Sequence, residues 1–404
     1  QQFRAVEGPY LYGGMEGHSV QVLFPNRQRF VFWDKASYVP WWDVDQVALT
    51  YEFAEAWGFR TQGCAEPMQD RECRYSTVNI IENTPARIVI HWRYALADVH
   101  YRIYKNEWVD EFYCFYPDGV GIREVNLWAN DDETHEFFEI IPVNPPSMQE
   151  KDMFGDYVAR LSNFSGDVFT TDDFIKDGNA VRNKLYKPDA DILVEVILNN
   201  NMHPFAVVTF RDSVNPGVIS EAALGGSREY SMSSHRGHWP ASEYAIDGYN
   251  LVGNHRPTHG NIGSVKGKVN SAANPNTFTH MLGIAPKGTD DARSHGFCWL
   301  NPGVIIPDGP TLHYRGYDMK QKAYLLETEG KASKLQFTLA PGKCPVKNPV
   351  FIIKDIRSED VKNILINNKQ LRNEEFQTGN SLKNECIIFI SKTISESGNL
   401  EINL

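Results

Sequence analysis

Four of the twelve histidines in this chain lie within one segment, residues 233–264. They are His235, His238, His255 and His259. Glycine and proline recur through the segment, which predicts a loop rather than a helix or a strand. The same segment holds two arginines, two tyrosines and a tryptophan, namely Arg236, Arg256, Tyr244, Tyr249 and Trp239. A loop with these residue types offers a base, an acid and an anion clamp, which are the groups needed to remove a proton beside a carboxylate.

Removal of the C5 proton of a uronic acid assigns a role to each residue type. Arginine neutralises the carboxylate because its planar guanidinium makes two parallel hydrogen bonds to it. Neutral histidine suits the base, and tyrosine can protonate the group that leaves C4. We therefore predict His259 or His238 as the base, Tyr244 as the acid and Arg256 as the carboxylate clamp. Further substrate contacts are expected from His235, Arg236, Trp239, Asn254 and His255.

The spacing of these histidines also allows metal binding. Two residues separate His235 from His238, and three separate His255 from His259. Such pairs bind Zn²⁺ in other proteins, and a distant carboxylate, His280 or His295 could complete a site. We predict chemistry without a cofactor, with a structural or catalytic divalent metal such as Zn²⁺ or Ca²⁺ as the alternative. The sequence contains no motif for a nucleotide cofactor.

Carboxylate pairs offer a third chemistry, glycoside hydrolysis, in which two acids lie about 5–10 Å apart across the sugar. Adjacent residues of a strand point to opposite faces, so a neighbouring pair places at most one acid in a given cleft. Hydrolysis therefore stays an alternative to proton abstraction. The candidate pairs are Asp43 with Asp45, Asp110 with Glu111, and Asp131 with Glu133.

Two adjacent tryptophans, Trp41 and Trp42, follow a predicted turn. Aromatic residues make up 12% of the chain, and flat aromatic faces are common both in sugar-binding clefts and in β cores. We predict that Trp41 and Trp42 stack against the substrate, with packing at the rim of the fold as the alternative.

Composition excludes several classes of function. The 404 residues carry a net charge of −11, which argues against binding to nucleic acid phosphates. No apolar run is long enough to span a bilayer. The chain starts at Gln1, as a mature chain does after signal-peptide removal, so a secreted or periplasmic location is expected.

The cysteines divide into two groups on the basis of their neighbours. Cys64 and Cys73 share a polar segment and could form a disulfide in an exported protein. Cys114 and Cys298 lie in apolar runs, so buried free thiols are expected there.

Strand patterns dominate the chain, whereas long amphipathic helices are nearly absent apart from a weak helical pattern at 150–161. In 87–94, apolar and polar residues alternate with a period of two, as in a half-buried strand. We therefore predict an all-β fold, a large antiparallel β-sandwich with few short helices. Strands are expected at 18–24, 28–34, 46–53, 87–96, 98–104, 107–116, 120–129, 135–143, 191–198, 205–210, 278–284, 296–300, 322–327 and 335–340.

A change in composition near Pro341 suggests a division of the chain. Residues 1–341 are predicted to form the catalytic β-sandwich. Residues 342–404, which lack Trp and Tyr, are predicted to be strands that close the sandwich or form a small appended module.

Several segments resemble a group of exported bacterial proteins. These are 109–128, the His238-Trp239-Pro240 triplet with Asp247-Gly248, 256–259, 348–356 and 364–371. The group resembles the galactose-mutarotase-like β-sandwich, or super-sandwich, of polysaccharide lyases. The resemblance implies polysaccharide degradation, and points to lyases or oligosaccharide dehydratases that act on the uronic acids of ulvan.

The sequence thus predicts an enzyme that performs β-elimination on an anionic oligosaccharide and leaves a 4,5-unsaturated uronate. The alternatives are a glycoside hydrolase or epimerase on the same fold, or a non-catalytic glycan-binding protein. Neither nucleic acid nor a membrane span is expected, and the sequence does not indicate an oligomeric state.

Overall fold

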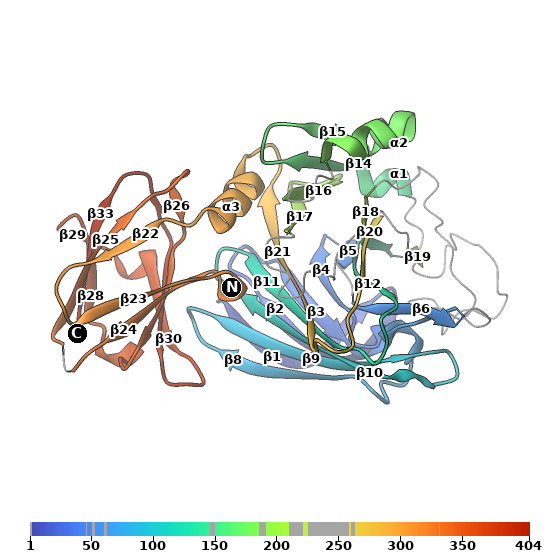
Figure 1. Ribbon diagram of the computed structural model, residues 1–404, viewed down its shortest axis with the longest axis horizontal. Helices are drawn as coiled ribbons and strands as arrows, with labels where there is room; N and C mark the ends of the chain where they lie inside the picture. The colour runs from blue at the N-terminus through green and yellow to red at the C-terminus, as the bar shows by residue number, and fades with distance from the viewer. Residues whose placement is uncertain are drawn as a thin grey trace.

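Alternating apolar residues in the first 300 residues build two large antiparallel sheets that pack face to face (Figure 1). The computed structural model describes residues 2–45, 47–50, 53–59, 63–145, 150–185, 191–209, 221–224, 258–259, 263–330 and 332–404. The seven-stranded sheet has the order β1 (Arg4–Tyr12), β2 (Met15–Leu23), β3 (Arg29–Trp33), β4 (Pro40–Val44), β5 (Val47–Thr50), β13 (Ile141–Asn144) and β19 (Thr258–His259). The nine-stranded sheet has the order β15 (Val168–Thr170), β14 (Phe154–Asn163), β16 (Ile192–Leu198), β17 (Met202–Val208), β21 (Asn276–Pro286), β11 (Val120–Trp128), β10 (Ile103–Phe115), β9 (Ile88–Ala97) and β8 (Thr77–Asn83).

Aromatic rings fill the space between the two sheets. Phe30 and Phe32 of β3 lie two residues apart and therefore share one face of their strand. They contact Tyr113 and Phe115 of β10, with ring centroids 4.8 to 5.4 Å apart. This packing confirms the predicted all-β antiparallel sandwich.

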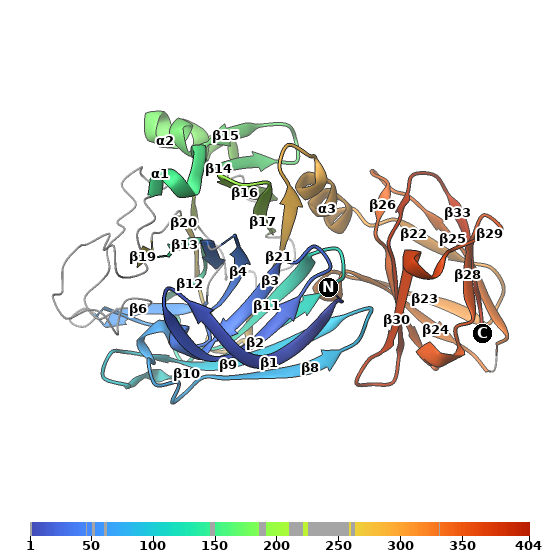
Figure 2. The ribbon, with the colours of Figure 1, turned by 180° about the vertical axis from the view of Figure 1, so that it is seen from behind.

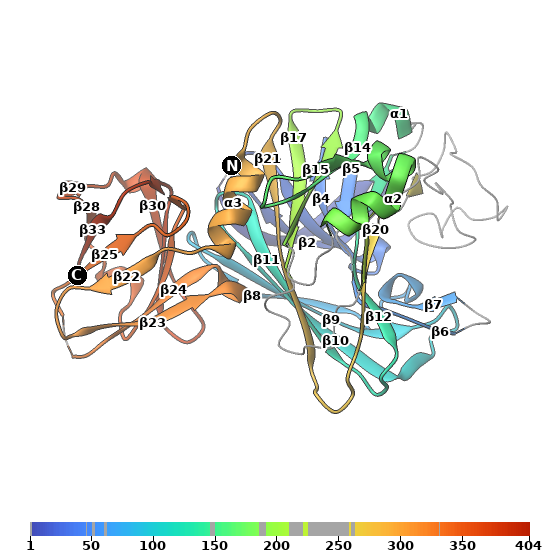
Figure 3. The same cartoon turned by 45° about the horizontal axis from the view of Figure 1, so that its top comes forward.

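A smaller five-stranded sheet, here called the lateral sheet, lies beside the sandwich (Figure 3). Its order is β18 (Glu221–Leu224), β20 (Gly263–Lys268), β12 (Thr134–Glu139), β6 (Glu55–Phe59) and β7 (Gly63–Ala65). Since β12 runs on into β13 of the seven-stranded sheet after residue 140, the lateral sheet and the sandwich are joined through the backbone.

An ion pair between Arg123 of β11 and Glu111 of β10 lies at the centre of the sandwich, with both side chains fully buried. The guanidinium donates two hydrogen bonds of 2.7 Å to the carboxylate. Tyr94 and Tyr113 donate to the same carboxylate at 2.6 and 2.7 Å. Four charge-assisted hydrogen bonds thus offset the cost of removing Glu111 from water.

The same network extends to the lateral sheet. Arg123 also donates to the carbonyl of Phe137 in β12 at 2.8 Å. The hydroxyl of Tyr94 accepts a 2.5 Å hydrogen bond from the amide of Ala54, the residue before β6. Two strands of the lateral sheet are therefore fixed to the buried ion pair.

Replacing Arg123 tests this arrangement. In Arg123→Met the Glu111 carboxylate loses its cation, and we expect the free energy of unfolding to fall by about 3–5 kcal/mol. Urea unfolding followed by tryptophan fluorescence measures the change. The matched control is Arg357→Met, which breaks the pair with Glu359, whose two side chains are 60% and 57% exposed, and should lower the free energy of unfolding far less. Equal losses in the two variants would contradict a central role for the buried pair.

The strands from residue 304 onward form a separate unit of two five-stranded sheets, here called the C-terminal unit (residues 304–404; Figure 2). One sheet has the order β22 (Val304–Pro307), β25 (Lys334–Ala340), β33 (Gly398–Asn403), β28 (Asn363–Ile366) and β29 (Lys369–Gln370). The other has the order β23 (Leu312–Asp318), β24 (Ala323–Thr328), β27 (Val350–Lys354), β31 (Cys386–Ile390) and β30 (Phe376–Asn380), and β26 (Val346–Lys347) pairs with β32 (Thr393–Ile394).

The expected division at residue 341 does not coincide with a boundary between sheets. β25 pairs with β33, so strands from both sides of residue 341 share one sheet. The composition change near Pro341 marks a difference in residue usage within the C-terminal unit, whereas its first strand starts at Val304.

Helices are few and short in the part of the chain that the structure describes. They are α1 (Glu150–Met153), α2 (Thr171–Leu185), α3 (Asp291–Leu300) and the 3₁₀ turns Asp34–Ala36, Pro67–Gln69, Met319–Gln321, Ser358–Asp360 and Asn373–Glu375. The strand predicted at 296–300 is wrong, because these residues end α3. The helical pattern at 150–161 is correct only over α1, and β14 follows it. None of the described helices is long and apolar enough to cross a membrane.

A buried aspartate joins the C-terminal unit to the sandwich. Asp118, in the turn between β10 and β11, accepts a 2.9 Å hydrogen bond from Asn348 and lies 3.8 Å from the Lys322 ammonium and 3.9 Å from His295 of α3. Burial alone would raise the pKa of Asp118, but Lys322 and His295 outweigh it, and the pKa is lowered. Asp118 is thus held as an anion at the junction.

His295 makes the stability of this junction depend on pH. Burial lowers its pKa from 6.5 to about 4, more strongly than Asp118 raises it. The unfolded chain therefore binds a proton on His295 more readily than the folded chain does. The contribution of neutral His295 to the free energy of unfolding is complete above pH 6.5. It is lost as the pH falls towards 4, by about 3 kcal/mol at most. We expect the unfolding midpoint of the wild type to fall between pH 7 and pH 5 by more than that of His295→Gln. Parallel curves for the two proteins would contradict this assignment.

Candidate functional site

The structure places only the end of the histidine-rich loop. Thr258 and His259 form β19, in which His259 pairs with Val143 of β13 at the edge of the seven-stranded sheet. The other predicted loop residues lie outside the described residues, and the structure does not test their roles. They are His235, Arg236, His238, Trp239, Tyr244, Asn254, His255 and Arg256.

The described strands that flank this loop belong to the lateral sheet and to the adjoining edge of the seven-stranded sheet. β18 ends at Leu224, β19 starts at Thr258, and β20 starts at Gly263 and pairs with β18. The backbone register aligns Glu221, Lys266, Glu136 and Glu55 in one row across four neighbouring strands. In the sequence, residues 225–257 follow β18, which contributes Glu221 to this row.

Glutamates gather where this row meets β7. Glu55, Cys64 and Glu66 each offer one atom, and these atoms lie within 4.8 Å of one another. Glu136 lies beside them and forms an ion pair with Lys266, with 3.0 Å between its carboxylate oxygen and the ammonium nitrogen. Glu55, Glu66 and Glu136 are all buried, and Cys64 is half-buried. We refer to Glu55, Cys64, Glu66 and Glu136 as the glutamate cluster.

The surroundings of Glu55 favour its neutral form. Burial raises the pKa of Glu55 well above its usual range, and the charge of Glu66 and a hydrogen bond to Glu66 raise it further. Gln69 donates to Glu66 at 2.5 Å. The raised pKa of Glu55 and its hydrogen bond to Glu66 are as expected for two neighbouring buried acids, in which the charge of one disfavours ionisation of the other.

This arrangement can donate a hydrogen bond or a proton at neutral pH. A carboxylic acid kept neutral by its surroundings can stabilise a developing anion or protonate a leaving group. The acids are hydrogen-bonded to each other, closer than the about 5–10 Å used for glycoside hydrolysis. The two carboxyls and the thiol could also hold a divalent cation, and a thiolate ligand would favour Zn²⁺ over Ca²⁺.

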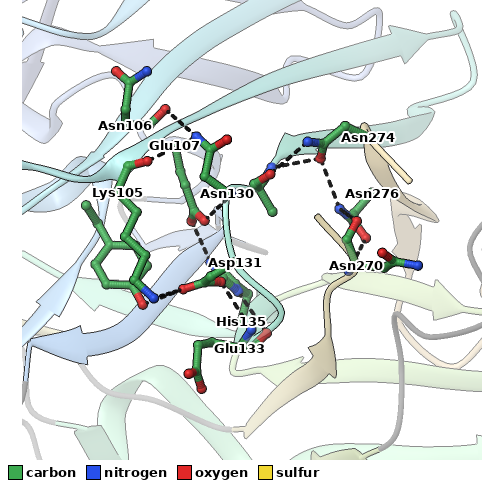
Figure 4. Close-up of polar contacts among 12 residues, drawn as sticks. Lys105, Asn106, Glu107, Asn130, Asp131, Glu133, His135, Asn270, Asn274 and Asn276 are labelled. Carbon is green, nitrogen blue, oxygen red and sulfur yellow. Dashed lines mark hydrogen bonds and ion pairs between the residues drawn. The ribbon is translucent and has the colours of Figure 1, made fainter. Parts of the chain in front are cut away.

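A second group of possible metal ligands consists of Glu107, Asp131 and His135 (Figure 4). Here protein donors already occupy the carboxylates. Glu107 accepts from His135 at 2.7 Å and from the amide of Asn130 at 2.8 Å, and Asp131 accepts from Lys105 at 2.5 Å. Glu107 lies within the irregular stretch of β10, between Ile103 and Trp108, and its contact with His135 fixes this stretch to β12. We therefore assign it a structural role.

Trp41 and Trp42 do not form the predicted stacking platform. The strand places the two side chains on opposite faces of the seven-stranded sheet. Both faces are covered at this point, so both side chains are fully buried. Trp42 packs against Phe24 in the interior of the sandwich, and Trp41 packs against Tyr12 on the other face. A sugar ring cannot stack on a fully buried indole, so the prediction for these two residues is corrected to core packing.

Cys64 and Cys73, which could form a disulfide in an exported protein, are free thiols in this structure. Cys64 hydrogen-bonds to Glu55 within the glutamate cluster, and Cys73 donates to the carbonyl of Asp34. Cys114 is buried as expected, whereas Cys298 is half-exposed because it lies on the helix α3 and not in a core strand.

The remaining predicted residues have structural partners. Asp110 faces outward and binds His91 at 2.8 Å, and Glu111 is in the core, so the two do point to opposite faces. Asp43 pairs with Arg29 at 2.5 Å. His280 is fully buried between aromatic rings.

Comparison with known proteins gives only distant similarities. No family model matches the sequence, and no curated protein matches it. Nineteen solved chains match the structure. They include YeaD from Salmonella typhimurium, a mutarotase candidate, with 9% identity over 70% of this chain and 94% of its own, at a TM-score of 0.32. They also include galactose 1-epimerase from Lactobacillus acidophilus, with 7% identity over 70% and 99%, at 0.33.

A polysaccharide lyase also matches, with 8% identity at a TM-score of 0.23. The match covers 99% of this chain but only 46% of that lyase. At TM-scores this low, the positions of active-site residues in these proteins cannot be matched to residues of this chain.

Replacing Glu55 tests its protonation state. The folded pKa of Glu55 is raised, so its contribution to stability is complete below the unfolded value and is lost as the pH rises through the folded value. Glu55→Gln keeps the shape and cannot ionise, so we expect its unfolding midpoint to exceed that of the wild type increasingly as the pH rises. The infrared band of a protonated carboxyl group should be present in the wild type and weaker in the variant. A wild type that gains stability relative to Glu55→Gln on raising the pH would contradict the assignment.

Proposed function

We propose that this chain is a carbohydrate-active enzyme that performs β-elimination on oligosaccharides containing uronic acids, as a polysaccharide lyase or an oligosaccharide dehydratase. The observation that supports the proposal is that β18 and β20, which precede and follow the histidine-rich loop in the sequence, belong to the same sheet as the strands of the glutamate cluster. The loop supplies the base and the acid, and the cluster supplies a protonated carboxyl group and the Lys266 cation.

The roles follow from the electron movement. His259 or His238 takes the C5 proton, the C4=C5 double bond forms, and the C4–O bond breaks as Tyr244 protonates the departing oxygen. Negative charge develops on the uronate carboxylate, and Arg256 neutralises it. A hydrogen bond from Glu55 would add to this stabilisation, because a neutral acid donates without the repulsion of a second anion.

The leaving group separates the two reaction types. A lyase expels the rest of the sugar chain from C4, and a dehydratase expels water from a terminal uronate. We further propose that the enzyme acts outside the cytoplasm on oligosaccharides such as ulvan fragments, which fits the sequence resemblance.

The test is incubation with ulvan fragments and other uronate oligosaccharides, followed by ultraviolet absorbance and mass spectrometry. Elimination gives the absorbance of an unsaturated uronate. His259→Ala and Tyr244→Phe should each lower kcat/KM by roughly 10²–10⁴-fold while leaving the circular dichroism spectrum unchanged. Chain shortening without the absorbance would replace elimination by hydrolysis, and affinity without turnover would indicate a binding protein. Loss of activity with a chelator would identify a divalent cation as part of the site.

A further inference from the structure

Two half-exposed cysteines meet where α3 contacts the C-terminal unit. Cys298 lies in the last turn of α3, and Cys344 lies in the segment between β25 and β26. The Cys298 thiol donates to the carbonyl of Pro345 at 2.7 Å, and the Cys344 thiol donates to the carbonyl of Asn301 at 3.6 Å. Each thiol therefore reaches the backbone beside the other cysteine, and the two thiols are close enough for the charge of one to raise the pKa of the other.

The backbone holds these segments together at two glycines. A methyl group on Gly303 would lie 2.6 Å from the carbonyl oxygen of Ala340, and one on Gly342 would lie 3.3 Å from that of Pro302. Residues 301–303 and 340–346 can approach this closely only because side chains are missing at both positions. The proximity of the thiols is thus set by the packing of the two segments and not by side-chain rotamers alone.

The thiols are also open to solvent. Both line a surface pocket of about 440 Å³ with Arg293, Phe297, Lys347 and Thr393. Small thiol reagents can therefore reach them, whereas Cys114 and Cys386 are buried. Among the six cysteines, this is the pair whose positions favour a covalent bond.

We propose that Cys298 and Cys344 form a disulfide under oxidising conditions, which ties α3 of the sandwich to the C-terminal unit. One thiolate attacks a small-molecule disulfide such as oxidised glutathione and forms a mixed disulfide, with release of one thiol. The second cysteine attacks the mixed disulfide and releases the second thiol. Two cysteine thiols are oxidised and one glutathione disulfide is reduced, so electrons and protons balance.

This bond does not depend on the proposed enzymatic function. It closes a loop from residue 298 to residue 344, which contains β22, β23, β24 and β25. The closed loop restricts the conformations of the unfolded chain. The Asp118 contacts hold the same junction without a covalent bond, and the disulfide would add to them.

The experiment compares reduced protein with protein equilibrated with oxidised glutathione at mildly alkaline pH, since the thiolate is the nucleophile. Remaining thiols are alkylated after unfolding, and peptides are mapped without reduction. We expect a linked pair of peptides that contain Cys298 and Cys344, a mass lower by two hydrogen atoms, and an unfolding temperature raised by roughly 5 °C. Alkylation of both cysteines, or a separate glutathione on each, would overturn the proposal.

Two variants complete the test. In Cys298→Ser the mixed disulfide on Cys344 cannot resolve, so Cys344 should carry glutathione and the rise in unfolding temperature should disappear. Cys73→Ser removes another half-exposed thiol and should behave as the wild type. The peptide map of the wild type decides the proposal even where a variant fails to fold.

Discussion

The buried ion pair between Arg123 and Glu111 is the interaction on which the rest of the sandwich depends. A carboxylate at this depth is tolerable only because all its partners are in place. Those partners come from β9, β10 and β11, and the outer ends of the network fix the backbone at Phe137 and Ala54. Each of these anchor points is one residue away from a glutamate of the cluster, Glu136 or Glu55. The core therefore determines where the candidate site can hold its acids.

The glutamate cluster combines this rigid support with an unfavourable electrostatic arrangement. Three carboxyl groups are buried close together, so burial and the charges of its neighbours raise the pKa of Glu55, and the Lys266 ammonium lies beside Glu136. Acids with pKa values shifted in this way are common in active sites, and they also occur in structural networks of ion pairs. The cluster differs from the group around Glu107, in which amides, a lysine and a histidine satisfy the carboxylates.

Period-two alternation made the fold predictable from the sequence, because a half-buried strand leaves that pattern wherever it occurs. Successive residues of a strand point to opposite faces, so the adjacent Trp41 and Trp42 cannot form one stacking platform. Both faces of the sheet are covered at these residues, which is why the predicted contact with the substrate is wrong. The glutamate cluster was missed because Glu55, Glu66 and Glu136 are brought together by pairing between strands distant in sequence. No local motif marks such a site, whereas the histidine-rich loop was visible because its residues are neighbours in sequence.

The position of β33 has a consequence for the order of synthesis. This strand lies between β25 and β28, at the middle of its sheet, although it is made after both of them. Until residues 398–403 emerge from the ribosome, β25 and β28 each lack the partner that satisfies one of their edges, and open edges can pair with other chains. The nine-stranded sheet has a similar requirement, because β21 lies between β11 and β17 and is made after both, but all its strands precede residue 287. During translation the sandwich can therefore assemble first, whereas the C-terminal unit can complete its sheet only after residues 398–403 have been made.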